Sequence, residues 1–400
     1  PCSGRLSPRQ RNKRVRLDAI QQMMSRAYSG RKAKAGVARI YRFSRQITSP
    51  QYEASAASCC SAMRELGFDD VELLHFPVDG KRFYGAWRTP RHWDIRKAYL
   101  EVRIGKKWHM VADYSRVPTS VFLYSAPTAG EVRTTLVNED GEDARGKLVF
   151  APNLSRKSLE DLQSKGAAGL VTDYAPDWPG VRGPRDFRTG HRWDNSFLFD
   201  DRRQLAGFSL NRDQGDMIRK ALEEDGTLEC RYRIDGKLGA GKIACATGCL
   251  RGSEKPEEEV IVAAHLYEPG ANDNCSGVAG SIEALRAIRE LVEAGKLSAP
   301  ARTIRVVFTF EIVGFLAYFA RDRRRGKRYV AGVNPDMIGE DQAKCRSTLF
   351  VYQNPHASSS FADPLLVDMV GRFAGKSFLY EVKNFIVNDN MISDPAIGVP

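Results

Sequence analysis

The chain has 400 residues, of which 42% are hydrophobic and 28% are charged. This length and composition are enough to bury one large core or two moderate cores, and they exclude a globally disordered chain. The net charge is +12, from 61 Lys and Arg against 49 Asp and Glu. Basic residues concentrate in the first fifty positions and in residues 321–328, with no binding motif around either. We therefore expect a solvated face or a basic tail and no nucleic-acid partner.

Neither a membrane span nor a disulfide framework is predicted. No apolar run approaches the ~18 residues that a transmembrane helix needs, and no apolar segment typical of a signal peptide is visible near the first residues. The eight cysteines are scattered, apart from the adjacent Cys59 and Cys60 and the pair Cys245 and Cys249. This usage favours a reducing compartment, and we expect a cytoplasmic protein. The oligomeric state is left open.

The first part of the chain is predicted to be mainly helical. Residues 1–16 are basic and polar, which predicts a disordered segment or an appended leader, and residues 17–28 have helical spacing. Two further helices are expected on either side of Ser49-Pro50, because the residue before a proline disfavours helical backbone. Strands are predicted over residues 71–78 and 97–104.

The pattern changes between about Pro118 and Ile243. A turn leads into a strand that ends near Ala151, and residues 158–165 have helical spacing. Gly166-Ala-Ala-Gly169 predicts a tight turn into another strand, and one more strand and helix follow from Ala206. Residues 174–195 are rich in Gly and Pro and are predicted to form a long surface loop.

Three apolar strands in the last third of the chain each end at a histidine or an acidic residue. They are residues 259–264 before His265, residues 303–310 before Glu311, and residues 329–335 before Asp336. In an open α/β sheet, ligands gather outside the carboxyl ends of the strands. Imidazole and carboxylate groups suit zinc or a similar divalent ion.

Asp273 follows His265 by eight residues and comes just before a predicted helix. Two interpretations of this loop are open. Asp273 is a metal ligand together with His265, or Asp273, Asn274 or Ser276 caps the helix that follows.

Several of these segments together resemble the M28 family of zinc aminopeptidases. They are His265 with Ala271-Asn-Asp-Asn-Cys-Ser-Gly277, Glu311-x-x-Gly314, and Asn334-x-Asp-Met-Ile-Gly339. The short spacing from His265 to Asp273 is most similar to the aminopeptidase-like DUF4910 branch. The resemblance spans roughly residues 245–400. It implies an α/β fold with a mixed, mostly parallel sheet and helices on both faces.

Residues 142–173 resemble the protease-associated (PA) domain, which M28 peptidases often carry as an insertion. The similarity lies in Gly146-Lys, a helix, and Gly166-Ala-Ala-Gly169. The alternative is an ordinary small α/β insertion. The resemblances imply four segments. These are a basic extension over 1–29, the first part of a peptidase domain over 30–117, a PA-like domain over 118–243, and the second part of the peptidase domain over 244–400.

The M28 resemblance implies roles for four residues. His265 and Asp336 would be terminal ligands of one metal, Asp273 the bridging carboxylate, and Glu311 the general base. The implied cofactor is zinc, as one or two ions, or another divalent metal. Asn272 would contact the substrate, and Asp389 would help to position the substrate or a ligand. Asp394 is the rival of Asp389, and a helix-cap or turn role is open for both.

Two departures from the family pattern bear on activity. The family has a second Glu, which holds the other metal, where this chain has Ile312, a residue without a donor atom. A shift of one residue would therefore make Glu311 a ligand and not the base. The family's last His ligand follows a segment that corresponds to Gly398-Val-Pro400, where this sequence stops, so we expect a fragment that lacks it.

The resemblance to the M28 family thus implies a metal-dependent aminopeptidase that hydrolyses the N-terminal peptide bond of peptides through a metal-activated water. The alternative is a catalytically impaired or inactive relative that binds a peptide or a partner protein.

Overall fold

The computed structural model describes most of the chain. The described residues are 8–43, 46, 49–140, 143–151, 156–177, 183, 186–193, 196–197, 205–321, 328–355, 358, 360–374, 378–384, 388–393 and 397–400. The chain divides into two compact units. One comprises residues 1–43, 54–76 and 244–400, and the other comprises residues 44–53 and 77–243. Within the described residues, no helix combines the length and the apolar character that crossing a bilayer requires.

The first unit is built on a five-stranded sheet in the order β1-β11-β13-β12-β14. Its strands are β1 (Asp69–Val78), β11 (Gly241–Leu250), β12 (Lys255–His265), β13 (Arg302–Thr309) and β14 (Tyr329–Val333). β12 runs parallel to both of its neighbours, β13 and β14. β11 runs antiparallel to β13. The sheet is therefore mixed, and its parallel centre brings the carboxyl ends of three strands to one edge.

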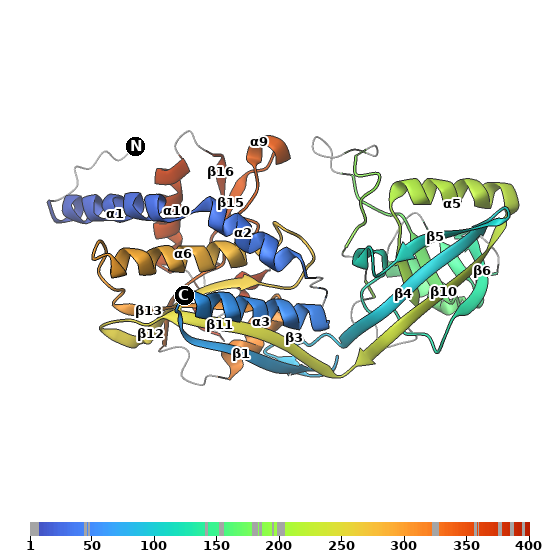
Figure 1. Cartoon of the computed structure of the whole chain (residues 1–400), viewed down its shortest axis with the longest axis horizontal. Helices are drawn as coiled ribbons and strands as arrows, with labels where there is room; N and C mark the ends of the chain where they lie inside the picture. The colour runs from blue at the N-terminus through green and yellow to red at the C-terminus, as the bar shows by residue number, and fades with distance from the viewer. Residues whose placement is uncertain are drawn as a thin grey trace. The chain divides into compact units, whose positions relative to one another are not determined.

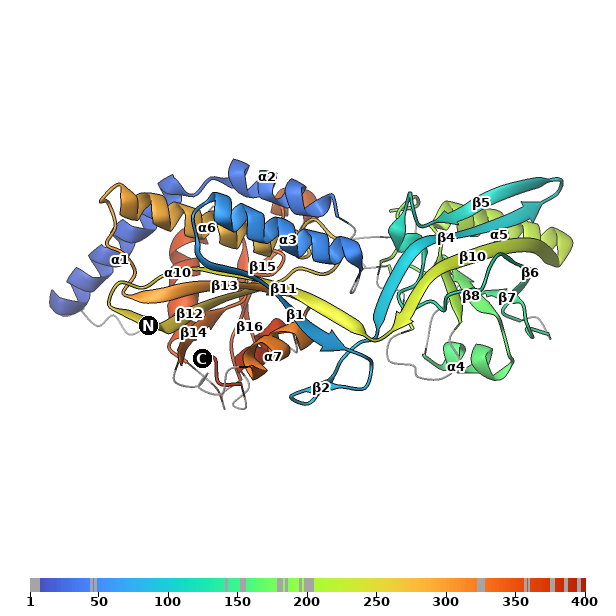
Figure 2. The ribbon, with the colours of Figure 1, turned by 60° about the horizontal axis from the view of Figure 1, so that its bottom comes forward.

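Helices cover both faces of this sheet (Figures 1 and 2). α2 (Gly30–Tyr41), α3 (Pro50–Glu65) and α6 (Cys275–Glu293) lie on one face, and α7 (Val313–Ala320) lies on the other. Residues 313–319 of α7 are all buried, as expected for a helix of apolar residues packed on a sheet. The predicted α/β fold with helices on both faces is confirmed.

This unit has further elements outside the five-stranded sheet and the four helices that cover it. They are α1 (Pro8–Ala27), α9 (Gln342–Cys345), β15 (Leu349–Tyr352), α10 (Ala362–Ala374), β16 (Tyr380–Lys383) and the 3-10 helix η3 (Asp389–Ser393). β15 and β16 pair in parallel as a separate two-stranded sheet. α1 begins at Pro8, so it starts inside residues 1–16, which were predicted to be a disordered segment or a leader. The physical reason is composition, because most residues of α1 are Arg, Gln, Lys, Leu, Met or Ala, which are good helix formers.

The second unit has its own seven-stranded sheet in the order β5-β4-β10-β6-β7-β8-β9. Its strands are β4 (His92–Ile104), β5 (Lys107–Asp113), β6 (Val132–Asn138), β7 (Leu148–Phe150), β8 (Gly169–Thr172), β9 (Ala206–Ser209) and β10 (Thr227–Gly239). The first four strands in the sheet order are antiparallel neighbours, and β6 to β9 are parallel. Its other described elements include two helices, α4 (Arg156–Ser164) and α5 (Arg212–Asp225), the 3-10 helix η1 (Pro118–Ser120), and two short hairpin strands, β2 (Phe83–Tyr84) and β3 (Trp87–Arg88).

The larger segment of the second unit starts at Pro77, whereas the sequence-based division places the start of the inserted domain at Pro118. β4 and β5 were expected in the peptidase domain, but β4 pairs with β10 from Val102 to His92. This long antiparallel pairing ties residues 92–113 to the second sheet. Pairing between segments so distant in sequence leaves no local signal. The unit ends at Ile243.

Candidate metal centre

The parallel strands at the centre of the first unit place three candidate side chains at one edge of the sheet. His265 is the last residue of β12 and lies opposite Thr309 of β13. Glu311 follows two residues after Thr309, and Asp336 follows three residues after the end of β14. Both acids lie close enough to His265 for its charge to affect their pKa values. The parallel pairing of β12 with β13 and β14 thus places the residues that follow these strands at one edge of the sheet.

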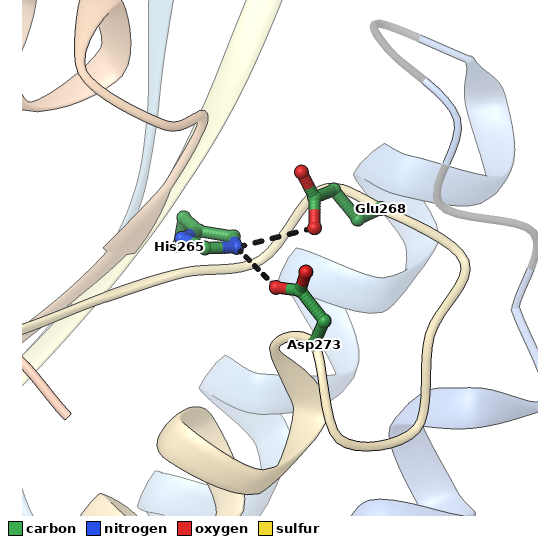
Figure 3. Close-up of side chains that lie close together, drawn as sticks. All are labelled: His265, Glu268 and Asp273. Carbon is green, nitrogen blue, oxygen red and sulfur yellow. Dashed lines mark hydrogen bonds and ion pairs between the residues drawn. The ribbon is translucent and has the colours of Figure 1, made fainter. Parts of the chain in front are cut away.

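His265 is buried, with 3% of its surface exposed, and acidic groups face both of its ring nitrogens. Nδ1 lies 2.9 Å from Oδ2 of Asp389. Nε2 lies 3.0 Å from Oδ1 of Asp273 and 3.5 Å from Oε2 of Glu268 (Figure 3). When Nδ1 carries a proton, the Nδ1–H group donates a hydrogen bond to the Asp389 carboxylate. Nε2 then faces Asp273 and Glu268. A histidine oriented in this way by a carboxylate is typical of metal sites.

Asp389 therefore lies against the Nδ1 side of His265, a position that suits the second of its two predicted roles, which was to position a ligand. It is 1% exposed, and its second oxygen accepts a hydrogen bond from the Ile312 N–H at 2.8 Å. Both oxygens are thus engaged within the protein. Ile312, which has no side-chain donor, contributes to the site through its backbone. Asp394 lies outside the described residues.

One donor atom from each of His265, Glu268 and Asp273 can be chosen so that the three atoms lie within 4.8 Å of one another. One nitrogen and two carboxylate oxygens match the ligand chemistry of zinc. Oε2 of Glu268 and Oδ1 of Asp336 are buried and have no hydrogen-bond partner among the described residues. A buried carboxylate oxygen without a partner is costly unless a cation compensates it. The residues of this site therefore fit a divalent metal ion.

The shifted pKa values of the site residues also fit a divalent metal ion. Burial lowers the pKa of His265, but Asp389, Asp273 and Glu268 outweigh burial and hold this pKa well above its ordinary value. Burial raises the pKa of Glu268 to about 8, against the opposing effect of His265. Burial likewise raises the pKa of Asp336 to about 6. A divalent cation at this position would favour the ionised carboxylates.

The group of three differs from the predicted ligand set in one member. The sequence predicted Asp336 with His265 and Asp273, whereas the third member of the compact group is Glu268. Asp336 lies near enough for the charges of His265 and Asp273 to affect its pKa. Sequence analysis missed Glu268, although its place three residues after His265, in the same strand-end loop, was a signal that could have drawn attention to it.

Glu311 lies beside this group and is held by an aromatic pair. Its Oε2 accepts a hydrogen bond from the Tyr267 hydroxyl at 3.1 Å. The Tyr267 ring stacks on Phe310, with 4.3 Å between ring centroids. Burial, followed by the charge of Asp389, raises the pKa of Glu311. The carboxylate is thus fixed in position and made more basic than an exposed one.

Asn272 and Ser276 join the loop before α6 to the loop after β14. Oδ1 of Asn272 accepts hydrogen bonds from the Gly339 N–H at 3.0 Å and from the Ser276 hydroxyl at 3.1 Å. The Ser276 hydroxyl in turn accepts a bond from the Ile338 N–H at 3.0 Å. Asn272, predicted to contact the substrate, is therefore placed as a connection between two loops.

Asn274 resolves the two interpretations of the loop after His265. Its side chain accepts a hydrogen bond from the Gly277 N–H at 2.9 Å, which caps α6. It also donates to the Pro335 carbonyl at 3.1 Å. Because Asn274 supplies the cap, Asp273 can face His265. The segment from Asn272 to Gly277 thus caps α6 through Asn274 and directs Asp273 toward His265.

The fold and this cluster define an α/β protein with a candidate divalent-metal site at the carboxyl ends of parallel strands. Residues 247–388 match the sequence profile of Peptidase family M28. The matched segment contains His265, Glu268, Asp273, Glu311 and Asp336. No curated protein sequence matches the chain.

Solved structures of peptidases have a similar fold. A zinc aminopeptidase from Bacillus subtilis is 17% identical, with 92% of this chain and 83% of that chain covered and a TM-score of 0.61. The Peptidase M28 precursor from Shewanella amazonensis SB2B is also 17% identical, with 96% and 86% covered and a TM-score of 0.63. An aminopeptidase from Aneurinibacillus sp. strain AM-1 is 16% identical, with 95% and 85% covered and a TM-score of 0.52.

At these identities the similarity concerns the fold. Together with the M28 match, it supports the predicted assignment of this protein to the hydrolases. The DUF4910 branch and the PA identity of the inserted residues stay predictions.

Proposed function

We propose that this protein is a metal-dependent aminopeptidase that hydrolyses the N-terminal peptide bond of peptides. One observation carries the proposal. His265 is oriented by Asp389 at Nδ1 and presents Nε2 to buried or half-buried carboxylates, inside a segment that matches Peptidase family M28. The fold shared with a zinc aminopeptidase supports it.

Two residues form the centre of the proposed metal site. Nε2 of His265 and Oδ1 of Asp273 are 3.0 Å apart, so both can contact one ion, and a further carboxylate completes the protein ligands. A zinc ion bound there supplies Lewis-acid activation of water near neutral pH. Asp389 keeps the His265 ring in the tautomer and orientation that leave Nε2 available.

Glu311 is the proposed general base. Its carboxylate is fixed by Tyr267 beside the three-residue group, so it can accept a proton from the attacking water and pass it to the leaving amine. The pKa of Glu311 is raised by burial, which brings its basicity closer to neutral pH. This is the tuning that proton transfer at neutral pH requires.

The charge of the site suits a substrate with a free amino group. Five carboxylates surround one imidazole, those of Glu268, Asp273, Glu311, Asp336 and Asp389. A divalent cation balances only part of this charge when the carboxylates are ionised. The remaining negative potential favours an ammonium group near the ion, which is the feature that distinguishes the end of a peptide from its interior.

The test compares wild type with Glu311→Gln and His265→Ala in the zinc-loaded state. Hydrolysis of amino-acid p-nitroanilides is measured next to the same substrates with an acetylated amino group. We expect wild type to cleave only the substrates with a free amino group. We expect Glu311→Gln to retain zinc and to lose about 10²–10⁴-fold in turnover, because Gln preserves size but cannot accept the proton. His265→Ala should lose both zinc and activity.

Loss of zinc in Glu311→Gln would make Glu311 a ligand and remove it as the base. If wild type retains zinc and cleaves no substrate, with cobalt or manganese as well, the aminopeptidase proposal fails. The peptide-binding relative without catalysis would then be the better description.

A further inference from the structure

We propose that Glu268 is the third protein ligand of the metal ion, in the position that the sequence predicted for Asp336. The inference rests on the proposed metal site and says which residues of this chain form it. The resulting set is His265 through Nε2 and one carboxylate oxygen each from Asp273 and Glu268.

Distances favour this set. Two ligands bonded to one zinc ion at about 2.0–2.2 Å can be at most about 4.4 Å apart. The donors of His265, Glu268 and Asp273 lie within 4.8 Å of one another, so small side-chain movements close the site. Asp336 is not a member of this group, and it belongs to the loop after β14 and not to the loop between β12 and α6.

Burial of an unpaired oxygen is a second observation, which Glu268 shares with Asp336, so the distances decide between the two residues. Glu268 is 6% exposed, and its Oε2 has no hydrogen-bond partner among the described residues. The 3.5 Å between this oxygen and Nε2 of His265 is too long for a hydrogen bond of normal strength. A carboxylate oxygen that is directed at a histidine nitrogen across this distance leaves room for an ion that contacts both.

The backbone at Glu268 directs its side chain into the site. Its φ is +86°, in the left-handed region that side chains other than glycine rarely adopt. Such conformations persist where the surrounding structure holds them, and they concentrate at functional sites. In Figure 3 the loop after β12 rises from His265 to Glu268 and then curves round to Asp273, and the Glu268 carboxylate points back toward the His265 ring.

The proposed set has one nitrogen and two oxygen ligands from the protein and leaves a coordination position open. Three protein ligands with an open position are typical of catalytic zinc sites, whereas structural sites are closed by four. The assignment leaves Asp336 near the ion without a bond to it. It can then act on the substrate or on the charge of the site.

The test compares Glu268→Gln with Asp336→Asn, two substitutions that each remove one buried carboxylate near His265 and preserve its shape. Zinc affinity of the metal-stripped full chain is measured by competition with a chromophoric chelator. Removing an outer-shell partner costs about 10–100-fold in affinity. We expect Glu268→Gln to lose more than 100-fold and Asp336→Asn to lose less. The visible absorption spectrum of bound cobalt should change in Glu268→Gln and stay close to wild type in Asp336→Asn.

Folding is checked on the same samples by circular dichroism and thermal unfolding without metal. If Glu268→Gln does not fold, Glu268→Asp is used, because the shorter side chain retains the charge but withdraws the oxygen from the ion. A folded Glu268→Gln that binds zinc as wild type does overturns the assignment, and so does a greater loss of affinity in Asp336→Asn. Either result leaves the aminopeptidase proposal standing if wild type cleaves peptides. A wild type that binds zinc through Glu268 but cleaves nothing refutes only the aminopeptidase proposal.

Discussion

His265 derives its properties from the groups that hold its two ring nitrogens. Asp389 lies 2.9 Å from Nδ1, and the same carboxylate accepts a bond from the backbone of Ile312. The two contacts connect the end of β12 to the segment before α7. The orientation of one imidazole thus depends on residues more than a hundred positions away.

We predict that Asp389→Asn lowers zinc affinity by about 10–100-fold, the usual effect of an outer-shell partner. Asn retains a hydrogen-bond acceptor for Nδ1 but removes the charge that makes His265 a stronger ligand. Isothermal titration of the metal-stripped protein measures the change. Glu340→Gln, an exposed acid in the loop after β14, is the control and should bind zinc as wild type does. Equal affinity in both variants would show that Asp389 does not support His265.

We also predict a specific pH dependence of stability from Asp336. Its pKa is raised from 3.8 to about 6, with burial as the main cause. Between about pH 4 and pH 6 the folded metal-free protein binds more protons than the unfolded chain. The free energy of unfolding therefore falls as pH rises through this range. The contribution is at most about 3 kcal/mol. Urea unfolding at several pH values should show a weaker decline in Asp336→Asn, and an unchanged profile would mean that Asp336 titrates normally.

At the scale of elements, the site depends on a close contact between the loop before α6 and the loop after β14. Gly277 lies at the start of α6, and a Cβ there would be 2.1 Å from the Pro335 carbonyl oxygen and 2.4 Å from Oδ1 of Asn274. Backbone and a capping side chain cannot both withdraw without loss of hydrogen bonds. The glycine of the Asn-Asp-Asn-Cys-Ser-Gly segment is therefore required by packing.

We predict that Gly277→Ala separates these two loops and weakens zinc binding. It should also lower the free energy of unfolding by about 1–3 kcal/mol, as expected when a buried hydrogen bond is lost. Gly280→Ala is the matched control on the same helix. Its Cβ would be 3.0 Å from the end of the flexible Ile338 side chain, which can move aside. Chemical denaturation and zinc titration of both variants provide the measurements. Similar losses in the two variants would contradict the role given to Gly277.

At the scale of the whole molecule, the chain has two compact units, each with its own sheet and core. All residues of the candidate site belong to the first unit. The second unit has large fully buried side chains of its own, among them Trp93, Leu100, Phe122 and Phe208. Separate cores permit separate unfolding, which a single melting temperature would conceal.

We predict two thermal transitions, of which zinc shifts only one. A ligand that binds the folded state at 100 times its dissociation constant stabilises it by about 2.7 kcal/mol, and here this acts on the first unit. Leu100→Ala, in β4, should instead destabilise the second unit by about 2–5 kcal/mol. Differential scanning calorimetry with and without zinc distinguishes the two effects. A single transition, or an equal shift of both by zinc, would show that the two units unfold as one.

Much of this protein could be inferred from local sequence. The apolar runs before His265, Glu311 and Asp336 predicted buried strands and their functional ends, because side-chain burial and strand direction leave a local pattern. Asp273 in the strand-end loop and the glycines at turns are equally visible. These signals were sufficient for the fold class and for most of the residues around the candidate metal.

Only the tertiary structure decided the remaining roles, because they depend on contacts between residues far apart in the chain. Asp389 lies against His265 across 124 positions, and β4 belongs to the second sheet through its pairing with β10. Glu268 is close in sequence, but its proposed role rests on a left-handed backbone and on a buried Oε2 that has no hydrogen-bond partner among the described residues. Residue type and spacing specify which groups are available, whereas the distances between those groups are set only when the strands and loops pack together.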